Sequence, residues 1–169
     1  TRIQECAFAY CHQLAEIEMS DGLLEIESWA FIQCKTLKSI VIPSTVTIIN
    51  NSAFEGCESL EEVDLFDGLL EIGSNAFDHC VSLKKITIPS TVQRIGSHAF
   101  YGASLPTICL PDGLERIGAY AFYHSRLTKF KFPPLVTTIT EGVLSSQAQR
   151  GGSEIVSVEL PESITQIEG

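Results

Sequence analysis

Hydrophobic residues recur along the chain at fixed intervals, and residues 72–95 show the pattern most completely. Over that stretch the order is I-x-x-x-A-F-x-x-C-x-x-L-x-x-I-x-I-P-x-x-V-x-x-I, and almost every other segment is a copy of it. Self-similarity at a period of about 20 to 50 residues is typical of solenoid folds. The sequence therefore predicts a fold built from stacked repeats.

The Ala-Phe pair of the pattern marks each copy. The pairs begin at Ala7, Ala30, Ala53, Ala76, Ala99 and Ala121. Their spacing is 23 residues four times and then 22, and Val143 stands another 22 residues on. One copy cannot bury its own apolar residues, so neighbouring copies must stack to cover them. We therefore expect residues 1–169 to form a single array of about seven repeats that belongs to a longer protein.

The L-x-x-I-x-I-P part of each copy alternates apolar and variable residues, which predicts a short strand ending near Pro. All copies run in the same direction, so these strands should pair in parallel, with right-handed connections through the rest of the repeat. The predicted strands are Ile17–Met19, Ile40–Ile42, Val63–Leu65, Ile86–Ile88, Ile108–Leu110, Phe130–Phe132 and Val158–Leu160.

The other half of each copy has a helical rather than an alternating spacing. Ile, Ala, Phe, Cys and Leu stand at relative positions 0, 4, 5, 8 and 11, which favours a helical turn or two. Residues suited to a helix N-cap stand two places after the Ile, at Ser28, Asn51, Ser74 and Ser97. The expected fold is thus an α/β right-handed solenoid, with parallel strands on one side and short helices or helical turns on the other.

Two features extend beyond the single repeat. Asp-Gly-Leu-Leu-Glu-Ile occurs at 21–26 and 67–72, and Pro-Ser-Thr-Val occurs at 43–46 and 89–92, which indicates a double unit of 46 residues. The seventh copy also has about six extra residues within Ser145–Ser153. Because this insertion is rich in Gly and Ser, we expect a mobile surface loop there.

Residues 37–57 read L-x-x-I-x-I-P-x-x-V-x-x-I-x-x-x-A-F-x-x-C. With its copies, this stretch resembles the BspA-like branch of the leucine-rich repeat proteins, which share an L-x-x-L-x-L core. The resemblance implies a right-handed arc with the strands on the concave face. It also implies binding of proteins or glycans, no enzymatic activity, and a cell-surface or extracellular location.

The chain departs from the general leucine-rich repeat at the position of the Asn or Cys ladder. The residues there are Gly22, Thr45, Gly68, Thr91, Gly113 and Leu135. None of them is Asn or Cys, so the sequence does not predict an asparagine ladder beneath the strands.

Net charge narrows the class of partner. Eleven Lys and Arg face 21 Asp and Glu, which gives a net charge of −10. This sign repels phosphate backbones and anionic lipid surfaces, and no apolar run approaches the roughly 20 residues of a spanning helix. We therefore expect no nucleic-acid binding and no membrane insertion, and a protein partner with a glycan as the alternative.

Four of the six cysteines occupy one column of the repeat, three residues after Phe, at Cys11, Cys34, Cys57 and Cys80. Ala103 and Ser125 fill this place in later copies, so the column requires a small side chain, which a buried thiol satisfies. We predict these four thiols to be reduced, buried and without metal. We expect neighbouring members of the column to be separated like packed helices, by about 8 to 10 Å.

No cofactor or metal site is predicted. Cys11-His12 and His79-Cys80 contain metal-binding residue types, but a zinc site needs about four donors at one point, whereas a solenoid distributes a column along its axis. Cys6 and Cys109 lie outside the column. Cys109 occupies an outward strand position and could be a reactive thiol or a tolerated substitution.

The variable positions of the predicted strands form the candidate concave binding face. They are Glu16, Glu18, Ser39, Val41, Glu62, Asp64, Lys85, Thr87, Thr107, Cys109, Lys129 and Lys131. The early part of this row is acidic and the late part basic, which is either a functional polarity or a chance trend among few charges. Aromatic residues in variable positions could anchor a partner or pack between repeats: Tyr10, Trp29, Tyr101, Tyr120 and Tyr123.

Three functions remain open from the sequence. The first is a non-enzymatic module that binds a protein or glycan through its concave strand face. The second is a passive structural or assembly element of a larger complex. The third, an enzyme, is the least favoured, because the sequence has no G-x-S-x-G or comparable signature and a solenoid column does not bring catalytic groups together.

Overall fold

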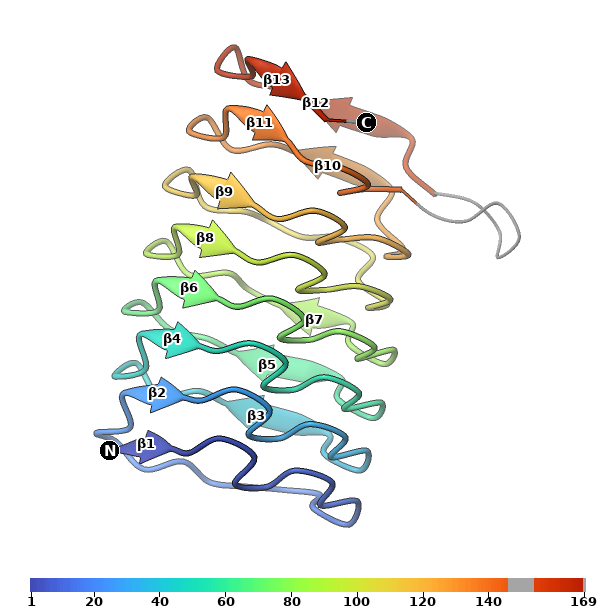
Figure 1. The fold of residues 1–169 in the computed structure, drawn as a ribbon. Helices are drawn as coiled ribbons and strands as arrows, with labels where there is room; N and C mark the ends of the chain where they lie inside the picture. The colour runs from blue at the N-terminus through green and yellow to red at the C-terminus, as the bar shows by residue number, and fades with distance from the viewer. Residues whose placement is uncertain (146–153, 169) are drawn as a thin grey trace.

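The computed structural model describes residues 1–145 and 154–168, which form a parallel β-solenoid. Figure 1 shows the coils stacked one above the other, with two rows of short strands on two sides of the stack. The rest of the predicted mobile loop, residues 146–153, lies outside the described ranges. The predicted helices or helical turns are wrong, since no residue in the described ranges is helical.

The first row of strands follows the L-x-x-I-x-I part of the repeat, and we call its outer surface the β3 face. Within the described residues it contains a three-stranded sheet, β3-β5-β7, and the pair β10-β12. The bounds are β3 Ser39–Val41, β5 Glu62–Asp64, β7 Lys85–Ile86, β10 Lys129–Lys131 and β12 Ser157–Glu159. Every pairing is parallel, as predicted from the repeat.

The assigned strands start one residue earlier than expected, and two of the predicted ones, Ile17–Met19 and Ile108–Leu110, are not assigned as strands. The alternation itself is as predicted in β3. Ile40 points into the core and is buried, whereas Ser39 and Val41 on either side are exposed. In the neighbouring strands, Val63 and Ile86 take the same buried place in register with Ile40.

The second row of strands was not predicted, and it follows the V-x-x-I part of the repeat. Within the described residues it contains the sheet β1-β2-β4-β6-β8-β9 and the pair β11-β13, all parallel. The bounds are β1 Arg2–Ile3, β2 Glu25–Ile26, β4 Ile48–Ile49, β6 Glu71–Ile72, β8 Arg94–Ile95, β9 Arg116–Ile117, β11 Thr138–Ile139 and β13 Gln166–Ile167. Two-residue strands are too short for alternation to reveal them in the sequence.

The backbone of the Ala-Phe segment explains why it is not helical. Trp29 and Gln33 have φ values of 56° and 58°, whereas a right-handed helix needs φ near −60°. The amide of Phe31 donates to the carbonyl of Ala53 in the next coil at 2.7 Å, and the amide of Cys34 donates to the carbonyl of Phe31 at 3.2 Å. Amides therefore alternate between the next coil and a local turn, instead of forming the regular bonds of a helix.

Residues predicted as N-caps bind between coils instead. The side-chain carbonyl of Asn51 accepts a hydrogen bond of 2.9 Å from the amide of Ser74, which lies one coil further on. The amide of Ser52 donates to the carbonyl of Ser74 at 2.8 Å. Polar residues of this segment satisfy backbone groups of a neighbouring coil, which would otherwise be partly buried without a partner.

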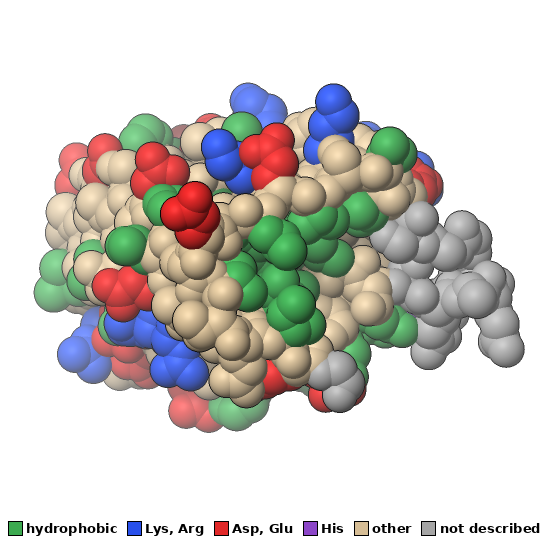
Figure 2. Space-filling view, turned by 90° about the horizontal axis from the view of Figure 1, so that it is seen from above, with side chains coloured by type: hydrophobic (Ala, Val, Ile, Leu, Met, Phe, Trp, Pro, Cys, Tyr) green, Lys and Arg blue, Asp and Glu red, His purple; other side chains and the backbone are tan. Residues whose placement is uncertain are grey.

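A column of stacked phenylalanine rings runs through the core. The rings of Phe54 and Phe77 are nearly parallel, with centroids 5.3 Å apart, and each is fully buried. The members of the column are Phe8, Phe31, Phe54, Phe77, Phe100 and Phe122. Figure 2, a view along the axis, shows hydrophobic side chains at the centre of the coil and charged ones at its periphery.

Threonine replaces the absent asparagine ladder in alternate coils. The Thr91 hydroxyl accepts a hydrogen bond of 3.0 Å from the amide of Gly68 and donates one of 2.7 Å to the carbonyl of Leu69. Thr45 makes the equivalent two bonds one double unit earlier. The 46-residue period thus corresponds to a turn with Gly followed by a coil whose Thr binds that turn.

Candidate binding surface

The β3 face brings the central part of the predicted row together. Ser39, Glu62 and Lys85 lie in register across β3, β5 and β7, and Val41 lies opposite Asp64. Lys129 and Lys131 flank the buried Phe130 in β10. The other candidates lie outside the assigned strands, at Glu16, Glu18, Thr87, Thr107 and Cys109. Eleven of the twelve candidate residues are exposed, and Glu62 is half-buried.

Ion pairs between coils offset part of the charge polarity predicted for this row. Lys85 forms a salt bridge with Glu62, and this contact raises the pKa of the Lys85 ammonium. Lys131 lies 3.8 Å from Glu159, which follows it in register on β12. Among the described residues, neither Glu18 nor Asp64 forms a salt bridge. Lys85 also interacts electrostatically with Asp64, so the negative charge of the row that has no ion-pair partner lies in the first coil, at Glu18.

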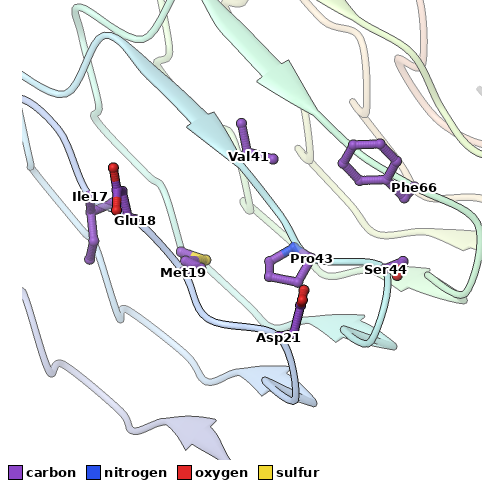
Figure 3. A pocket seen from close by; sticks show the side chains of 8 residues that line it. All are labelled: Ile17, Glu18, Met19, Asp21, Val41, Pro43, Ser44 and Phe66. Atoms are coloured by element: carbon purple, nitrogen blue, oxygen red, sulfur yellow. The ribbon is translucent and has the colours of Figure 1, made fainter.

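A hollow of about 520 Å³ lies in the first coils, where the row is acidic. We call it the apolar hollow, and it is lined by Ile17, Glu18, Met19, Asp21, Val41, Pro43, Ser44 and Phe66. In Figure 3, Glu18 and Phe66 lie at opposite ends of the hollow, and Met19, Val41 and Pro43 lie between them. Two candidate residues, Glu18 and Val41, belong to it.

The hollow arises from a break in the repeat. Pro follows the L-x-x-I-x-I segment in five of the seven copies, as at Pro43 and Pro89, but Ser20 takes this place in the first copy and Phe66 in the third. Phe66 is 48% exposed and Val41 is 52% exposed, so both present large apolar side chains to solvent. Phe66 was not among the predicted binding residues, although a Phe in a Pro column was a visible signal.

The second row of strands has a hollow of its own, of about 670 Å³, which is more polar. Arg94 and Arg116 lie side by side in register on β8 and β9. The Arg94 guanidinium is held by Glu71 at 2.6 Å, and Glu115 and Glu168 also line this space. Because acidic and basic groups are mixed there, the hollow has no clear electrostatic preference for one class of ligand.

Some of the aromatic residues in variable positions pack between coils, and the others are exposed to solvent. Tyr101 stacks on Tyr123 in the next coil, with centroids 5.1 Å apart, and Tyr120 stacks on His98 at the same distance. These three tyrosines therefore pack between repeats. Tyr10 and Trp29 are more exposed, at 61% and 40%.

The cysteine column is buried at Cys34, Cys57 and Cys80, and each of these thiols is free. Each thiol donates to a phenylalanine carbonyl of an earlier coil at 3.1 to 3.2 Å. Burial raises the pKa of the Cys34 thiol to about 11 and that of the other two well above the ordinary value. The thiols are therefore poor nucleophiles and form part of the core.

Two predictions about this column are wrong. Cys11 is free but exposed, because its coil is covered by a neighbouring coil on one side only. The expected separation of 8 to 10 Å also fails, since the stacked phenylalanine centroids beside the column are 5.0 to 5.5 Å apart. Coils joined by β-type hydrogen bonds lie closer together than packed helices.

The remaining chemistry of the surface is sparse. Among residues 1–145 and 154–168, no three His, Cys, Asp or Glu side chains are grouped so that they could hold a metal ion. Cys109 is exposed and lines a small hollow with Lys131 and Phe132. Within these two described ranges, there is also no helix long and apolar enough to cross a membrane.

Solved structures with a similar fold are bacterial leucine-rich repeat proteins. The T. pallidum leucine-rich repeat protein is 32% identical with a TM-score of 0.75, and the match covers 89% of this chain and 71% of that one. A leucine-rich repeat protein from Bacteroides ovatus ATCC 8483 is 25% identical with a TM-score of 0.67. That match covers 90% of this chain but 46% of the other, so this chain spans about half the length of that relative.

No curated protein is significantly similar to the chain. The model of the BspA type leucine-rich repeat region matches six copies, over residues 1–90 and 70–169. These matches agree with the repeat pattern, the parallel strands and the buried Leu, Ile and Phe columns. The chain therefore belongs to the BspA type leucine-rich repeat family.

Proposed function

We propose that the chain is a non-enzymatic protein-binding module that contacts its partner through the β3 face. The observation that carries this proposal is the exposure of Val41 and Phe66 around the apolar hollow, within a row of charged and polar side chains. Protein interfaces commonly combine a small apolar centre with a polar rim, and the apolar residues supply most of the affinity.

The contrast between inward and outward positions supports the same proposal. Inward positions of β3, β5 and β7 are filled by Ile40, Val63 and Ile86, which differ little in size and chemistry. Outward positions beside them range from Ser39 through Glu62 to Lys85. The core needs one kind of residue at each place, whereas the surface is uneven, as specific recognition requires.

A passive spacer is the competing function, and it predicts that changes on the β3 face leave all interactions unaltered. A neutral glycan is the competing ligand. The polar groups of the face are spread along the row, with one exposed aromatic ring, Phe66, in the apolar hollow. This arrangement supports contact with an apolar protein surface more than stacking against sugar rings.

The charge polarity of the row provides the test. A partner should be isolated by affinity capture from source cells, identified by mass spectrometry and purified. Its association rate should then be measured with wild type and with the double variant Lys129→Glu/Lys131→Glu. We expect a change in the association rate that diminishes as salt rises, because charges at an interface act largely by steering encounter.

The matched control is Arg116→Glu/Arg126→Glu, which changes the net charge by the same amount. Arg116 lies on β9 in the second row of strands, and Arg126 is exposed in the irregular stretch between the Ala-Phe segment and β10. A clearly larger effect of the lysine pair supports binding at the β3 face. Equal effects from both pairs would show that the response reflects net charge alone and would remove the β3 face as the site.

A further inference from the structure

We propose that the apolar hollow binds a protein segment that presents apolar side chains next to a lysine or an arginine. The proposal rests on the proposed function of the β3 face and specifies the chemistry of the partner there. It follows from two properties of the hollow: an exposed apolar floor, and the carboxylates of Glu18 and Asp21, which form no salt bridge among the described residues.

The floor of the hollow is formed by side chains from three successive coils. Met19 belongs to the first coil, Val41 and Pro43 belong to the second, and Phe66 belongs to the third. Val41 and Phe66 are each about half exposed. Covering such side chains stabilises a complex by removing apolar area from water, at roughly 25 cal/mol per Å² before the costs of association. The hollow therefore favours an apolar group over a fully polar one.

Carboxylates border this floor. Glu18 and Asp21 line the hollow, and Asp64 lies opposite Val41 across the β3-β5 pair. All three are exposed, and among the described residues none forms a salt bridge. Asp67 follows Phe66 in the sequence, but its carboxylate accepts hydrogen bonds of 3.1 and 2.9 Å from the amide and hydroxyl of Ser90.

The described basic residues of the same coils leave Glu18 and Asp21 without a salt bridge, whereas Asp64 interacts electrostatically with Lys85. Lys85 is paired with Glu62, and Lys84 lies 3.4 Å from Glu61. Lys38 precedes β3 and is not among the residues that line the hollow. A cation supplied by a partner would therefore find two carboxylates, Glu18 and Asp21, that form no salt bridge among the described residues.

Lysine and arginine combine the two properties that the hollow favours. Their aliphatic stems pack on apolar surface while the charged group remains near solvent, so the stem can pack on Val41 while the charged group points toward Glu18 at one end of the hollow. A volume of about 520 Å³ falls within the range of about 300 to 1,000 Å³ that is usual for ligand sites. An adjacent apolar side chain of the partner can occupy the rest.

Other classes of ligand fit less well. Nucleic acids, anionic lipids and acidic glycans would meet like charge at Glu18, Asp21 and Asp64. A neutral sugar could stack on Phe66, but its many hydroxyls would lose hydrogen bonds to water against Met19, Val41 and Pro43. The hollow therefore favours a basic and apolar protein segment.

The first test selects peptides from a random display library for binding to the wild-type chain. A counter-selection then removes the peptides that also bind the Phe66→Ser variant. Phe66 is half exposed, so its replacement should leave the fold intact, which a thermal melt by circular dichroism verifies. We expect enriched peptides to carry Lys or Arg within two positions of an apolar residue. In a separate selection without this removal step, peptides with the same pattern should bind Phe66→Ser at least about tenfold more weakly than wild type, as for an interface hot spot.

The second test addresses the charges with isosteric changes. The variant Glu18→Gln/Asp21→Asn should weaken the enriched peptides about fivefold at low salt, since each exposed ion pair contributes modestly. The control Glu115→Gln/Glu168→Gln removes the same charge from the second row of strands and should change affinity by less than about twofold. Replacing the peptide's arginine by citrulline, or its lysine by norleucine, should reproduce the loss.

Several results would overturn the proposal. They are a failure to enrich any peptide, enriched peptides without a cation, an equal loss in the control variant, or selective binding of neutral oligosaccharides in place of peptides. These results are distinguishable from failure of the β3 face itself. If a captured partner still responds to Lys129→Glu/Lys131→Glu, the face is the binding surface and only the assignment of the hollow is wrong.

Discussion

A Cβ atom placed on Gly96 would lie 2.4 Å from the backbone nitrogen of Ser74 in the preceding coil. The same holds at Gly118, where a Cβ would lie 2.3 Å from the nitrogen of Ser97. Glycine at these places therefore permits neighbouring coils to approach closely beside β8 and β9. The atoms in the way belong to the backbone, so they cannot move aside as a flexible side chain would.

We predict that Gly96→Ala lowers the free energy of unfolding by about 1 to 3 kcal/mol, the usual cost of overpacking. Gly113→Ala is the matched control, because a Cβ there meets the carbonyl oxygen of Ser90 at 3.5 Å, an ordinary contact. Urea denaturation of both variants measures the difference. Equal stability of the two variants would show that the coils are not in close contact at Gly96.

The phenylalanine column predicts a stability difference between the middle and the first coil. Phe77 is fully buried between the rings of Phe54 and Phe100, so Phe77→Ala should cost about 3 to 5 kcal/mol through the cavity it leaves. Phe8 is half-buried and stacks on Phe31, so Phe8→Ala should cost clearly less. Thermal or chemical denaturation measures the stability of the two variants. An equal loss of stability in Phe77→Ala and Phe8→Ala would contradict coupling between stacked repeats.

The cysteines should differ in reactivity in the folded chain. Burial raises the pKa of the Cys34 thiol to about 11, and the thiolate is the form that is alkylated. We therefore expect iodoacetamide at a pH of about 8 to modify the exposed Cys6, Cys11 and Cys109 first, and the buried thiols at Cys34, Cys57 and Cys80 after unfolding. Peptide mass spectrometry measures the order. Early modification of Cys57, or masses showing a disulfide within the column, would contradict the structure.

Asp78 predicts a pH dependence of stability. Its side chain is buried, and this raises the pKa of the carboxyl, although hydrogen bonds from His79 at 2.6 Å and Asn75 at 3.1 Å act in the opposite direction. When the folded pKa exceeds the unfolded value of about 3.9, the folded state binds the proton more tightly. This group therefore stabilises the fold at low pH, and that contribution is lost as pH rises through the folded pKa.

The comparison of Asp78→Asn with wild type isolates this effect. The free energy of unfolding of the variant relative to wild type should increase as pH rises from about 4 through the raised pKa, and then stay constant. Denaturation at a series of pH values gives the difference curve. A difference that falls with rising pH would mean that the fold stabilises the charged carboxylate, and it would contradict a raised pKa for Asp78.

Much of the fold could be predicted from the repeat. The L-x-x-I-x-I strands are parallel and bury the expected residues, because alternation over several positions is a strong signal. The helices were wrong because the spacing of Ile, Ala, Phe, Cys and Leu also suits a chain of turns. Trp29 and Gln33 adopt left-handed φ values, but unlike Gly, Trp and Gln do not indicate that conformation in a sequence.

The candidate surface was predictable in part. Alternation placed Ser39, Val41 and Asp64 outward, as the structure has them. The apolar hollow was not predicted, because it depends on Phe66 and Asp21, which lie beyond the alternating positions of their copies. The charge pairing of Lys85 with Glu62 also depends on the register between coils, which no single copy of the repeat reveals.

Site-specific photo-crosslinking tests the central claim, binding of a protein partner at the β3 face, most directly. A benzophenone side chain would be placed at Ser39, exposed on β3, and separately at Thr47, which is exposed beside β4 in the second row of strands. With the captured and purified partner present, irradiation should crosslink the Ser39 variant strongly and the Thr47 variant weakly. Crosslinking from Thr47 but not from Ser39 would contradict the account.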